Sequence, residues 1–294
     1  MSPIWSFFMQ LGLTLVVLGV CGVEHVTGAI ILSENFEGPA VGANVTTSNS
    51  VFNGNVTPGT GGVLQVTDEA TASIAFSGSK FLRYVDAATN SATMRSRFTI
   101  APLSQSAIAG LFQLSWDYYE PNAVISGTAT QFRVLLSQGD ITINANRAVD
   151  LLFNALNDGT ATSGFTTNWN DGLTNIAAYN TNSLVHFDVV GNVGPSTTYS
   201  LGDLPTQTID LYMNGILVAN NLIFRGPNDG GSAITGISEF GIGYSSSANR
   251  VQNVFVDNLV LSDEITLVPE PATCLLAVLA LVSMGGIRPR RSAE

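Results

Sequence analysis

Short runs of alternating apolar and polar residues, broken by Gly, Asn, Asp and Ser, fill the chain from Ile30 to Ser262. No long stretch repeats its apolar residues every three or four positions, as an amphipathic helix requires. Alternation places successive side chains on opposite faces of an extended backbone. The sequence therefore predicts a domain built almost entirely of β-strands.

More than ten such runs occur, and one twisted sheet of that width would leave too much apolar surface exposed. We therefore expect an all-β fold of two packed antiparallel sheets. Asn214-Gly215 predicts a tight hairpin turn, because both residues tolerate the positive φ angles of a type I′ turn. The clearest strand runs are 63–67, 72–76, 80–85, 92–100, 109–119, 131–136, 140–144, 148–153, 184–190, 208–213, 216–218, 239–244 and 254–261.

The run 111–119 alternates regularly enough to predict its two faces. One face is expected to pack into the core and the other to face water. The packed face would hold Phe112, Leu114, Trp116 and Tyr118, and the wet face Gln113, Ser115, Asp117 and Tyr119.

Charge and cysteine content exclude several classes of function. Between Ile30 and Pro271 the chain has eight basic residues against twenty acidic ones. Such a surface repels phosphate backbones, so nucleic acid is not an expected partner. Both cysteines, Cys21 and Cys274, lie in apolar end segments, so the region between them has no thiolate nucleophile, disulfide or Cys-ligated zinc.

The N-terminal segment has the features of a secretory signal. Residues 4–22 are almost wholly apolar, and Thr27-Gly28-Ala29 supplies the small residues of a cleavage site. The predicted signal peptide helix is 1–29. No Lys or Arg precedes the apolar run, and a retained N-terminal membrane helix is the alternative.

The C-terminal segment combines three elements in order. Val268, Pro269, Glu270 and Pro271 precede a charge-free apolar run, 272–287, which an arginine cluster follows. The run predicts a short transmembrane helix whose C-terminal end stays in the cytoplasm. The arginines are Arg288, Arg290 and Arg291.

This order resembles the PEP-CTERM sorting tail of bacterial envelope proteins linked to exopolysaccharide. The resemblance covers about the last 27 residues, and it implies recognition by an exosortase, a membrane-embedded cysteine transpeptidase, near the Pro-Glu-Pro. Pro289 within the arginine cluster departs from the pattern. A plain anchor that is never cut is the alternative. The expected domains are 1–29, a β-sandwich ectodomain 30–265 and the tail 266–294.

Four short segments resemble the concanavalin A-like, laminin-G-like jelly-roll sandwich. They are LYMNGILV at 211–218, GIGYSSS at 241–247, VFVDNLVLSDE at 254–264 and ENFEG at 34–38. The resemblance implies an antiparallel two-sheet jelly roll in which the strand near Glu34 lies beside the last strand.

Some jelly-roll sandwiches are glycoside hydrolases with Glu-x-Asp-x-x-Glu on one strand. The nearest match is 115–120, where Asp117 and Glu120 take the second and third acidic positions and Ser115 replaces the first. Ser cannot act as the nucleophile of that family, so no catalytic residue is expected. His186, in an alternating run, is expected to be a partly exposed strand residue, since one histidine does not make a multi-His metal site.

Three Asn-Asp-Gly triplets each bring a carboxylate and an amide oxygen to a turn, and oxygen ligands suit Ca²⁺. The candidate ligands are Asp158, Asp171 and Asp229. Laminin-G-like sandwiches often carry one calcium ion at the sheet rim, which makes calcium the expected cofactor if there is one. The alternative is that Asn, Asp and Gly simply form turns.

The polar segment 157–182 carries Phe165, Trp169 and Tyr179. Aromatic rings on a polar loop stack well on sugar faces, so these three are the candidate glycan contacts. A loop that tucks its aromatic rings over a sheet edge is the alternative.

Together these features predict an exported bacterial cell-surface protein, anchored in the membrane until processed, that acts as a structural or glycan-binding module of the extracellular matrix. The expected partners are an exosortase and an extracellular polysaccharide. The alternative is a polysaccharide-active hydrolase or lyase on the same fold.

Overall fold

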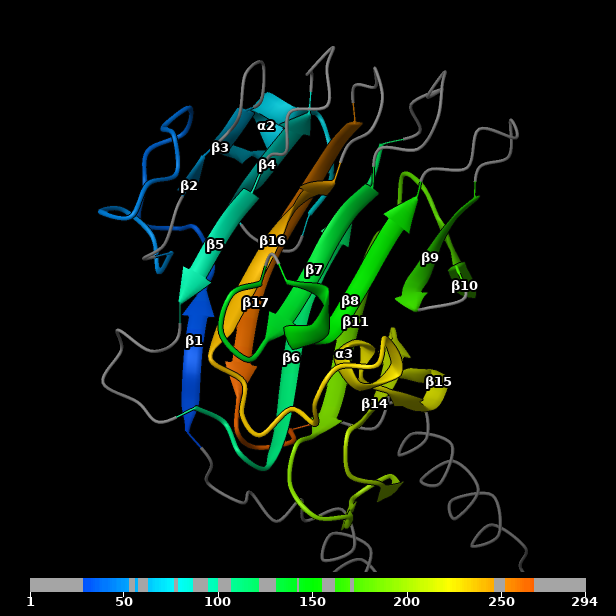
Figure 1. Cartoon of the computed structure of the whole chain (residues 1–294). Helices are drawn as coiled ribbons and strands as arrows, with labels where there is room; N and C mark the ends of the chain where they lie inside the picture. The colour runs from blue at the N-terminus through cyan, green and yellow to red at the C-terminus, as the bar shows by residue number, and fades with distance from the viewer. Residues whose placement is uncertain are drawn as a thin grey trace, which may run out of the picture. The chain divides into compact units, whose positions relative to one another are not determined.

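The structure is a computed structural model of the whole chain (Figure 1). It describes residues 29–52, 56–57, 63–76, 79–86, 95–99, 107–121, 131–141, 143–154, 162–169, 172–245 and 252–266. The β-rich unit is Gly28–Ile265.

One layer of the β-rich unit is an eight-stranded antiparallel sheet. Strand β1 pairs with β17, so the strand that leads into Glu34 does lie beside the last strand, as the sequence predicts. The sheet runs in the order β15 (Ile216–Ile223), β14 (Thr208–Met213), β11 (Leu184–Asn192), β6 (Leu111–Tyr119), β17 (Gln252–Ser262), β4 (Lys80–Asp86) and β3 (Val63–Asp68), with β1 (Ile30–Glu34) also on β17.

The other layer is a seven-stranded antiparallel sheet, which lies in front of the first in Figure 1. A separate hairpin joins two short strands, β12 (Thr197–Tyr199) and β13 (Gly202–Leu204). The seven-stranded sheet runs in the order β10 (Gly172–Asn180), β9 (Thr162–Trp169), β8 (Arg147–Asn154), β7 (Gln131–Ser137), β16 (Glu239–Ser245), β5 (Arg95–Thr99) and β2 (Val56–Thr57).

Aromatic side chains from both sheets interlock to form the core. Trp116 and Tyr118 of β6 pack against Phe153 of β8, with ring centroids 6.0 and 4.9 Å apart. Tyr118 also contacts Phe132 of β7 at 5.7 Å. Because rings of this size bury much apolar area, these contacts hold the layers face to face. The predicted two-sheet antiparallel sandwich is confirmed.

Local chemistry explains where the strand predictions succeed and fail. Asn214 and Gly215 have φ angles of 51° and 76°, as the predicted type I′ turn requires. The strand predicted at 72–76 is wrong, because Asp68 caps a short helix, α2 (Glu69–Ala72), by accepting a hydrogen bond from the amide of Thr71.

Two further segments differ from their predictions. The run 140–144 is not a strand but a turn that leads into the 3₁₀ helix η2 (Asn144–Asn146). The polar segment 157–182 is not one long loop, because it contains β9 and β10, which pair with each other up to Trp169 and Gly172. Their Thr and Asn content hid a hairpin that the apolar pattern did not reveal.

Buried charges attach a helix to the seven-stranded sheet. Asp150 of β8 is fully buried and forms ion pairs with Arg147, 2.8 Å away, and with Arg225 of α3 (Arg225–Asn228). The same arginine binds Asp229 at 3.0 Å, and helix α3 contacts both η2 and β8. One carboxylate therefore holds two buried guanidinium groups. Figure 1 shows α3 near the start of β8.

Replacing Asp150 should destabilise the fold strongly. Asp150→Asn leaves Arg147 buried without its counter-charge and leaves Arg225 with Asp229 alone, which costs about 3–5 kcal/mol of unfolding free energy. Urea denaturation measures the loss. The control is Asp68→Asn, since Asn caps a helix as well as Asp, so the unfolding free energy of this variant should match that of the wild type. Equal stabilities for the two variants would contradict the assigned role of Asp150.

Candidate functional site

The outward face of β6 was predicted to face water. Instead it carries polar side chains that are almost buried. Asp117 is 7% exposed and Gln113 is 5% exposed, while the residues of the other face lie in the core. Burying polar groups costs free energy unless they are hydrogen-bonded. The buried polar side chains on the outer face of the eight-stranded sheet are therefore the first candidates for a functional site.

Strand register brings polar residues from neighbouring strands into rows on this face. His186 of β11 lies directly opposite Asp117, and Asp188 lies opposite Ser115. On the other side of β6, Asp257 of β17 lies opposite Asp117. Residues paired in this way point to the same side of the sheet. Five residues from three strands, far apart in sequence, thus share one patch.

His186 bridges the two carboxylates of the patch. Its Nδ1 is 2.7 Å from Oδ1 of Asp117, and its Nε2 is 3.4 Å from Oδ2 of Asp188. The imidazole ring is the accessible part of this group, since the side chain of His186 is 44% exposed and that of Asp188 only 6%. We call these three residues the His186 cluster.

Neutral side chains donate further hydrogen bonds to both carboxylates. Asn258 donates from Nδ2 to Oδ2 of Asp117 at 2.8 Å. The hydroxyl of Ser115 and the amide of Gln113 donate to Oδ1 of Asp188 at 2.5 and 2.8 Å. Ionised carboxylates accept all of these bonds without rearrangement.

The two carboxylates hold His186 in its charged form. Hydrogen bonds that His186 donates to Asp117 first, and then to Asp188, raise the pKa of His186 from 6.5 to about 10 despite its partial burial. Burial would raise the pKa of Asp188, but the bonds from His186, Ser115 and Gln113 outweigh it and lower that pKa. At neutral pH the cluster is an imidazolium between two carboxylates.

This geometry differs from a Ser-His-Asp triad. In a triad the serine hydroxyl donates to the histidine, and one carboxylate orients the ring from the other side. Here Ser115 donates to Asp188, and both ring nitrogens of His186 face carboxylates. The cluster instead provides a proton donor beside two proton acceptors.

Glu120 lies on the other side of β6 from this cluster. Its Oε2 accepts hydrogen bonds from Tyr179 at 2.6 Å and Tyr118 at 3.3 Å, and both tyrosines are in the core. Asp117 and Glu120 therefore do not form the carboxylate pair of the hydrolase motif. The carboxylate missing at Ser115 has a counterpart in Asp188, directly opposite it on β11.

A second polar group borders the cluster on β14. Tyr212 lies opposite Asp188, and the hydroxyl of Tyr199, from β12, bonds to the hydroxyl of Tyr212 and to Oδ2 of Asp210. Burial, and then the bond to Asp210, raise the pKa of Tyr199, so this phenol stays protonated. On the opposite side the patch is bounded by an aromatic cluster, whose members are Phe76, Phe81, Tyr119 and Phe255.

Of the three candidate calcium ligands, the structure describes Asp229. Oδ2 of Asp229 is 3.0 Å from Nε of Arg225, so this carboxylate is already in an ion pair. Asp158 and Asp171 lie outside the described residues. Among the residues that the structure describes, no three His, Cys, Asp or Glu side chains come together as a metal site.

The candidate glycan contacts need a correction at Tyr179. This residue is 3% exposed and packs in the core against Phe187 and Phe153, so its ring is not available to a sugar. Phe165 and Trp169 lie on β9, and their side chains are outside the described part of the structure.

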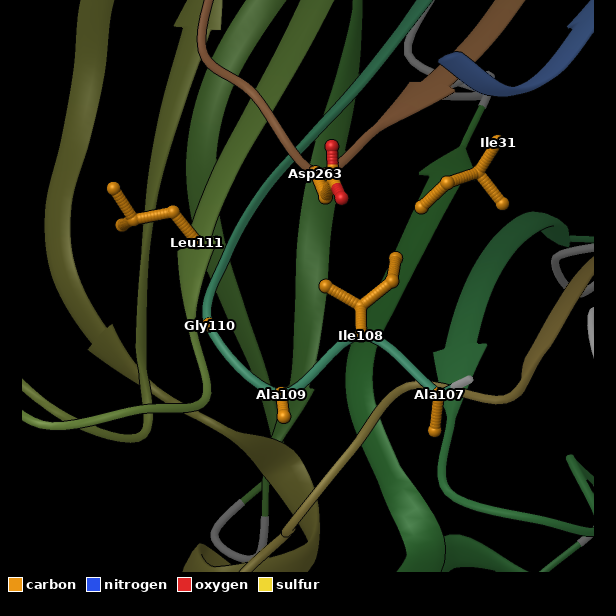
Figure 2. A pocket seen from close by; sticks show the side chains of 7 residues that line it. All are labelled: Ile31, Ala107, Ile108, Ala109, Gly110, Leu111 and Asp263. Atoms are coloured by element: carbon orange, nitrogen blue, oxygen red, sulfur yellow. The ribbon is translucent and has the colours of Figure 1, made fainter. Parts of the chain in front are cut away.

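A cavity of about 440 Å³ opens at the start of β6 (Figure 2). Asp263 is the one charged residue of its lining, and its carboxylate accepts a hydrogen bond from the amide of Ala29 at 2.8 Å. This lining has no second acid or base, which makes it a poorer candidate than the His186 cluster. The lining residues are Ile31, Ala107, Ile108, Ala109, Gly110, Leu111 and Asp263.

The two predicted end segments lie outside the described residues, including Val268–Pro271 and the arginine cluster. No helix within the described ranges has the length and apolar character needed to cross a membrane. The signal peptide, the transmembrane helix and the sorting motif remain predictions from sequence.

No protein-family model matches this chain, and no curated protein matches it. Among solved structures, a carbohydrate esterase from the Shiga toxin-encoding bacteriophage phi24B aligns with a TM-score of 0.51 and 10% identity. The alignment covers 80% of this chain and 99% of the esterase. At this identity the likeness concerns the fold, a β-sandwich.

Two further structures align less closely. The catalytic domain of a glycoside hydrolase family 131 protein from Coprinopsis cinerea has a TM-score of 0.46 and 13% identity, over 82% of this chain and 97% of the domain. An endo-β-1,4-glucuronan lyase from the fungus Trichoderma reesei has a TM-score of 0.45 and 9% identity, over 82% and 99%.

The charged state of His186 predicts a pH dependence of stability. Because its pKa in the folded protein lies above 6.5, the stabilisation is complete below about pH 6.5 and is lost as the pH rises to about 10. The wild type should therefore melt at progressively lower temperature over this interval. His186→Gln should show a flatter profile there, and an unchanged slope would contradict the cluster. Thermal melts in matched buffers compare the two.

Proposed function

We propose that this chain is a polysaccharide-active protein of the bacterial cell surface, with the His186 cluster as its reactive group. The observation that carries the proposal is the imidazolium placed between Asp117 and Asp188 on an outer sheet face. Cleavage of a glycosidic bond needs a proton donor for the leaving oxygen and an acceptor that activates water or removes a proton. The cluster has both.

The proposed roles follow from charge and access. His186, which is exposed and holds its proton, would donate to the glycosidic oxygen. Asp117 and Asp188 would then act as acceptors once the ring of His186 moves from between them. Ser115 and Gln113 are positioning residues, because their side chains donate hydrogen bonds to Asp188 and would not contact the substrate.

The fold supports a role with polysaccharides but does not identify which polysaccharide. The antiparallel sandwich aligns with a carbohydrate esterase of bacteriophage phi24B over most of both chains. We infer from the four sequence segments that the sandwich is a concanavalin A-like jelly roll. Ester cleavage as in that esterase is not proposed, because Ser115 bonds to Asp188 and not to His186.

Export and sorting are part of the same proposal and rest on the sequence. The apolar N-terminus with Ala29 would act as a signal peptide. Pro269, Glu270 and Pro271 with the following helix and arginines would form a PEP-CTERM tail that an exosortase recognises. The reactive face would then act outside the cell, where polysaccharide is present.

A second candidate is glycan binding without catalysis, as a structural or adhesive module. The burial of both carboxylates favours it, since Asp117 and Asp188 are 7% and 5% exposed and fully engaged in hydrogen bonds. In this case His186 and its neighbours would donate hydrogen bonds to a bound sugar, and no proton would be transferred.

A panel of neutral and acidic polysaccharides separates the two candidates. If the chain is an enzyme, the wild type releases reducing ends or unsaturated products. Asp117→Asn and Asp188→Asn should then each lower kcat by roughly 100-fold or more, because each removes a charged acid–base group. The control Asp68→Asn, at the cap of helix α2, should keep the wild-type rate.

The same panel is followed by thermal melts. If a glycan raises the melting temperature of the protein without being cleaved, the result supports glycan binding and contradicts catalysis. A panel with neither turnover nor a shift would overturn the proposed polysaccharide role. Turnover that survives Asp117→Asn and Asp188→Asn would remove the His186 cluster from the mechanism.

A further inference from the structure

The two sheets of the sandwich carry opposite charge. The strands of the eight-stranded sheet contain seven acidic residues, against one lysine and one arginine, Lys80 and Arg83. The strands of the seven-stranded sheet contain two acidic residues, Asp150 and Glu239, against four arginines. In a chain with 22 acidic and 11 basic residues, this reversal makes one sheet a local positive surface. The four arginines are Arg95, Arg97, Arg133 and Arg147.

Strand β16 shows which positions of the seven-stranded sheet face outward. Its Phe240 and Ile242 are in the core, so Gly241 and Gly243 occupy outward positions. The strand lies between β5 and β7 (Figure 1), and its register with both contains no shift. Glycine inside a strand often marks a bulge or a place where a ligand comes close. The regular register means that a bulge does not account for these two glycines.

Arginine positions flank both glycines. Arg95 of β5 lies opposite Gly243 on one side, and Arg133 of β7 lies opposite it on the other. Arg97 lies opposite Gly241, in the next outward row. The side chains of Arg95 and Arg97 are outside the described part of the structure, and their places on this face follow from the strand pairing. Since neighbouring strands are about 4.8 Å apart, Arg95 and Arg133 hold positions about 10 Å apart with no side chain of β16 between them.

The carboxylates near this face do not neutralise its arginines in full. Asp150 and Asp229 serve the buried guanidinium groups beside helix α3. Arg133 also reaches this group, with Nη1 3.6 Å from Oδ1 of Asp150. Glu239 adds one carboxylate, and Asp140 adds another in the turn that is hydrogen-bonded to the start of β16. With the arginine of α3, five arginines meet four carboxylates in the described part of this face.

We propose that this outer face, which we call the arginine face, binds an acidic polysaccharide through Arg95, Arg97 and Arg133. A guanidinium group forms two parallel, charge-assisted hydrogen bonds with a carboxylate. A polymer of uronic acids carries one carboxylate on each sugar, so successive sugars can reach successive arginines. Gly241 and Gly243 keep the positions between these arginines without side chains, where the sugar rings would lie.

A single polymer chain fits this charge distribution better than a large anionic partner does. Away from the arginine face the β-rich unit is acidic, so it repels a nucleic acid or an anionic membrane that approaches over a wide area. Duplex DNA also carries about one charge per 1.7 Å, which is much denser than one charge per sugar. A sugar chain can contact the arginine face alone.

The arginine face and the His186 cluster lie on different sheets and share no residue. The inference therefore does not rest on the reactive role proposed for His186. It adds an affinity for acidic glycan that would hold the protein to an extracellular matrix, whether or not the protein cleaves a polysaccharide.

Calorimetric titration of the full chain in detergent with alginate oligosaccharides tests the proposal. The wild type should bind them, and neutral dextran oligosaccharides of equal length should give no heat of binding. Arg95→Gln and Arg133→Gln should each weaken alginate binding by about 10-fold, because each removes a charge-assisted pair of hydrogen bonds. The matched control Arg83→Gln makes the same change of charge on β4 of the other sheet and should stay within about twofold of the wild type. His186→Gln should bind alginate like the wild type.

The remaining variant removes no charge. Gly243→Val places a side chain between the positions of Arg95 and Arg133, and it should weaken alginate binding as well. If Arg133→Gln does not fold, because Arg133 lies beside Asp150, then Arg95→Gln and Gly243→Val decide.

Several results would overturn the proposal. They are no heat with alginate, equal heat with dextran, or an equal loss of binding in Arg83→Gln and Arg95→Gln, which would reflect net charge and not a site. Binding to vesicles of anionic lipid without binding to alginate would assign the face to a membrane. Loss of turnover in variants of the His186 cluster would not affect this test, so the two proposals fail separately.

Discussion

Strand β6 is the element on which the rest of the structure depends, because each of its faces performs a different task. Its inward aromatic residues, including Trp116 and Tyr118, join the two sheets through contacts with Phe153 and Phe132. The same pleat turns Asp117 and Ser115 outward. Since a shift of one residue would exchange the two faces, the aromatic core fixes the register that creates the polar patch.

Buried charge is handled differently on the two outer faces of the sandwich. On the seven-stranded sheet, Asp150 neutralises Arg147 and Arg225 and thereby attaches α3. On the eight-stranded sheet, carboxylates outnumber cations, and the exposed His186 supplies their counter-charge. The first arrangement has the features of a structural ion pair. The second retains an accessible proton donor, which is why we place function there.

The alternation of apolar residues was sufficient to predict the two-sheet fold, most of the strands and the hairpin at Asn214-Gly215. It failed for β9 and β10, whose Thr-rich and Asn-rich sequences have little apolar pattern, and at 72–76, where the cap of Asp68 favours a helix. At the start of α2 a hydrogen bond to the side chain of Asp68, and not the hydrophobic period, decides the local structure.

The candidate site was only half visible in the sequence. Alternation places Ser115 with Asp117 and His186 with Asp188, each pair on one face of its own strand. That β11 pairs with β6, with His186 opposite Asp117, is a property of topology and register, which no local pattern contains. The Glu-x-Asp-x-x-Glu pattern lies on one strand, so it shows the absent carboxylate at Ser115 and does not reveal Asp188, its counterpart across the strand pair.

The row that contains the His186 cluster holds carboxylates in opposite environments. Asp257, Asp117 and His186 lie in one row across three strands, and Asp188 is bound to the same imidazole. Burial, and to a smaller extent the charge of Asp117, raise the pKa of Asp257, whereas the hydrogen bonds that Asp188 accepts from His186, Ser115 and Gln113 lower its pKa against burial. The imidazolium therefore stabilises the ionised form of the carboxylate that it touches, while Asp257, which it does not touch, favours its protonated form. This difference in charge across one row is the reason why we assign the reactive role to the side that holds His186.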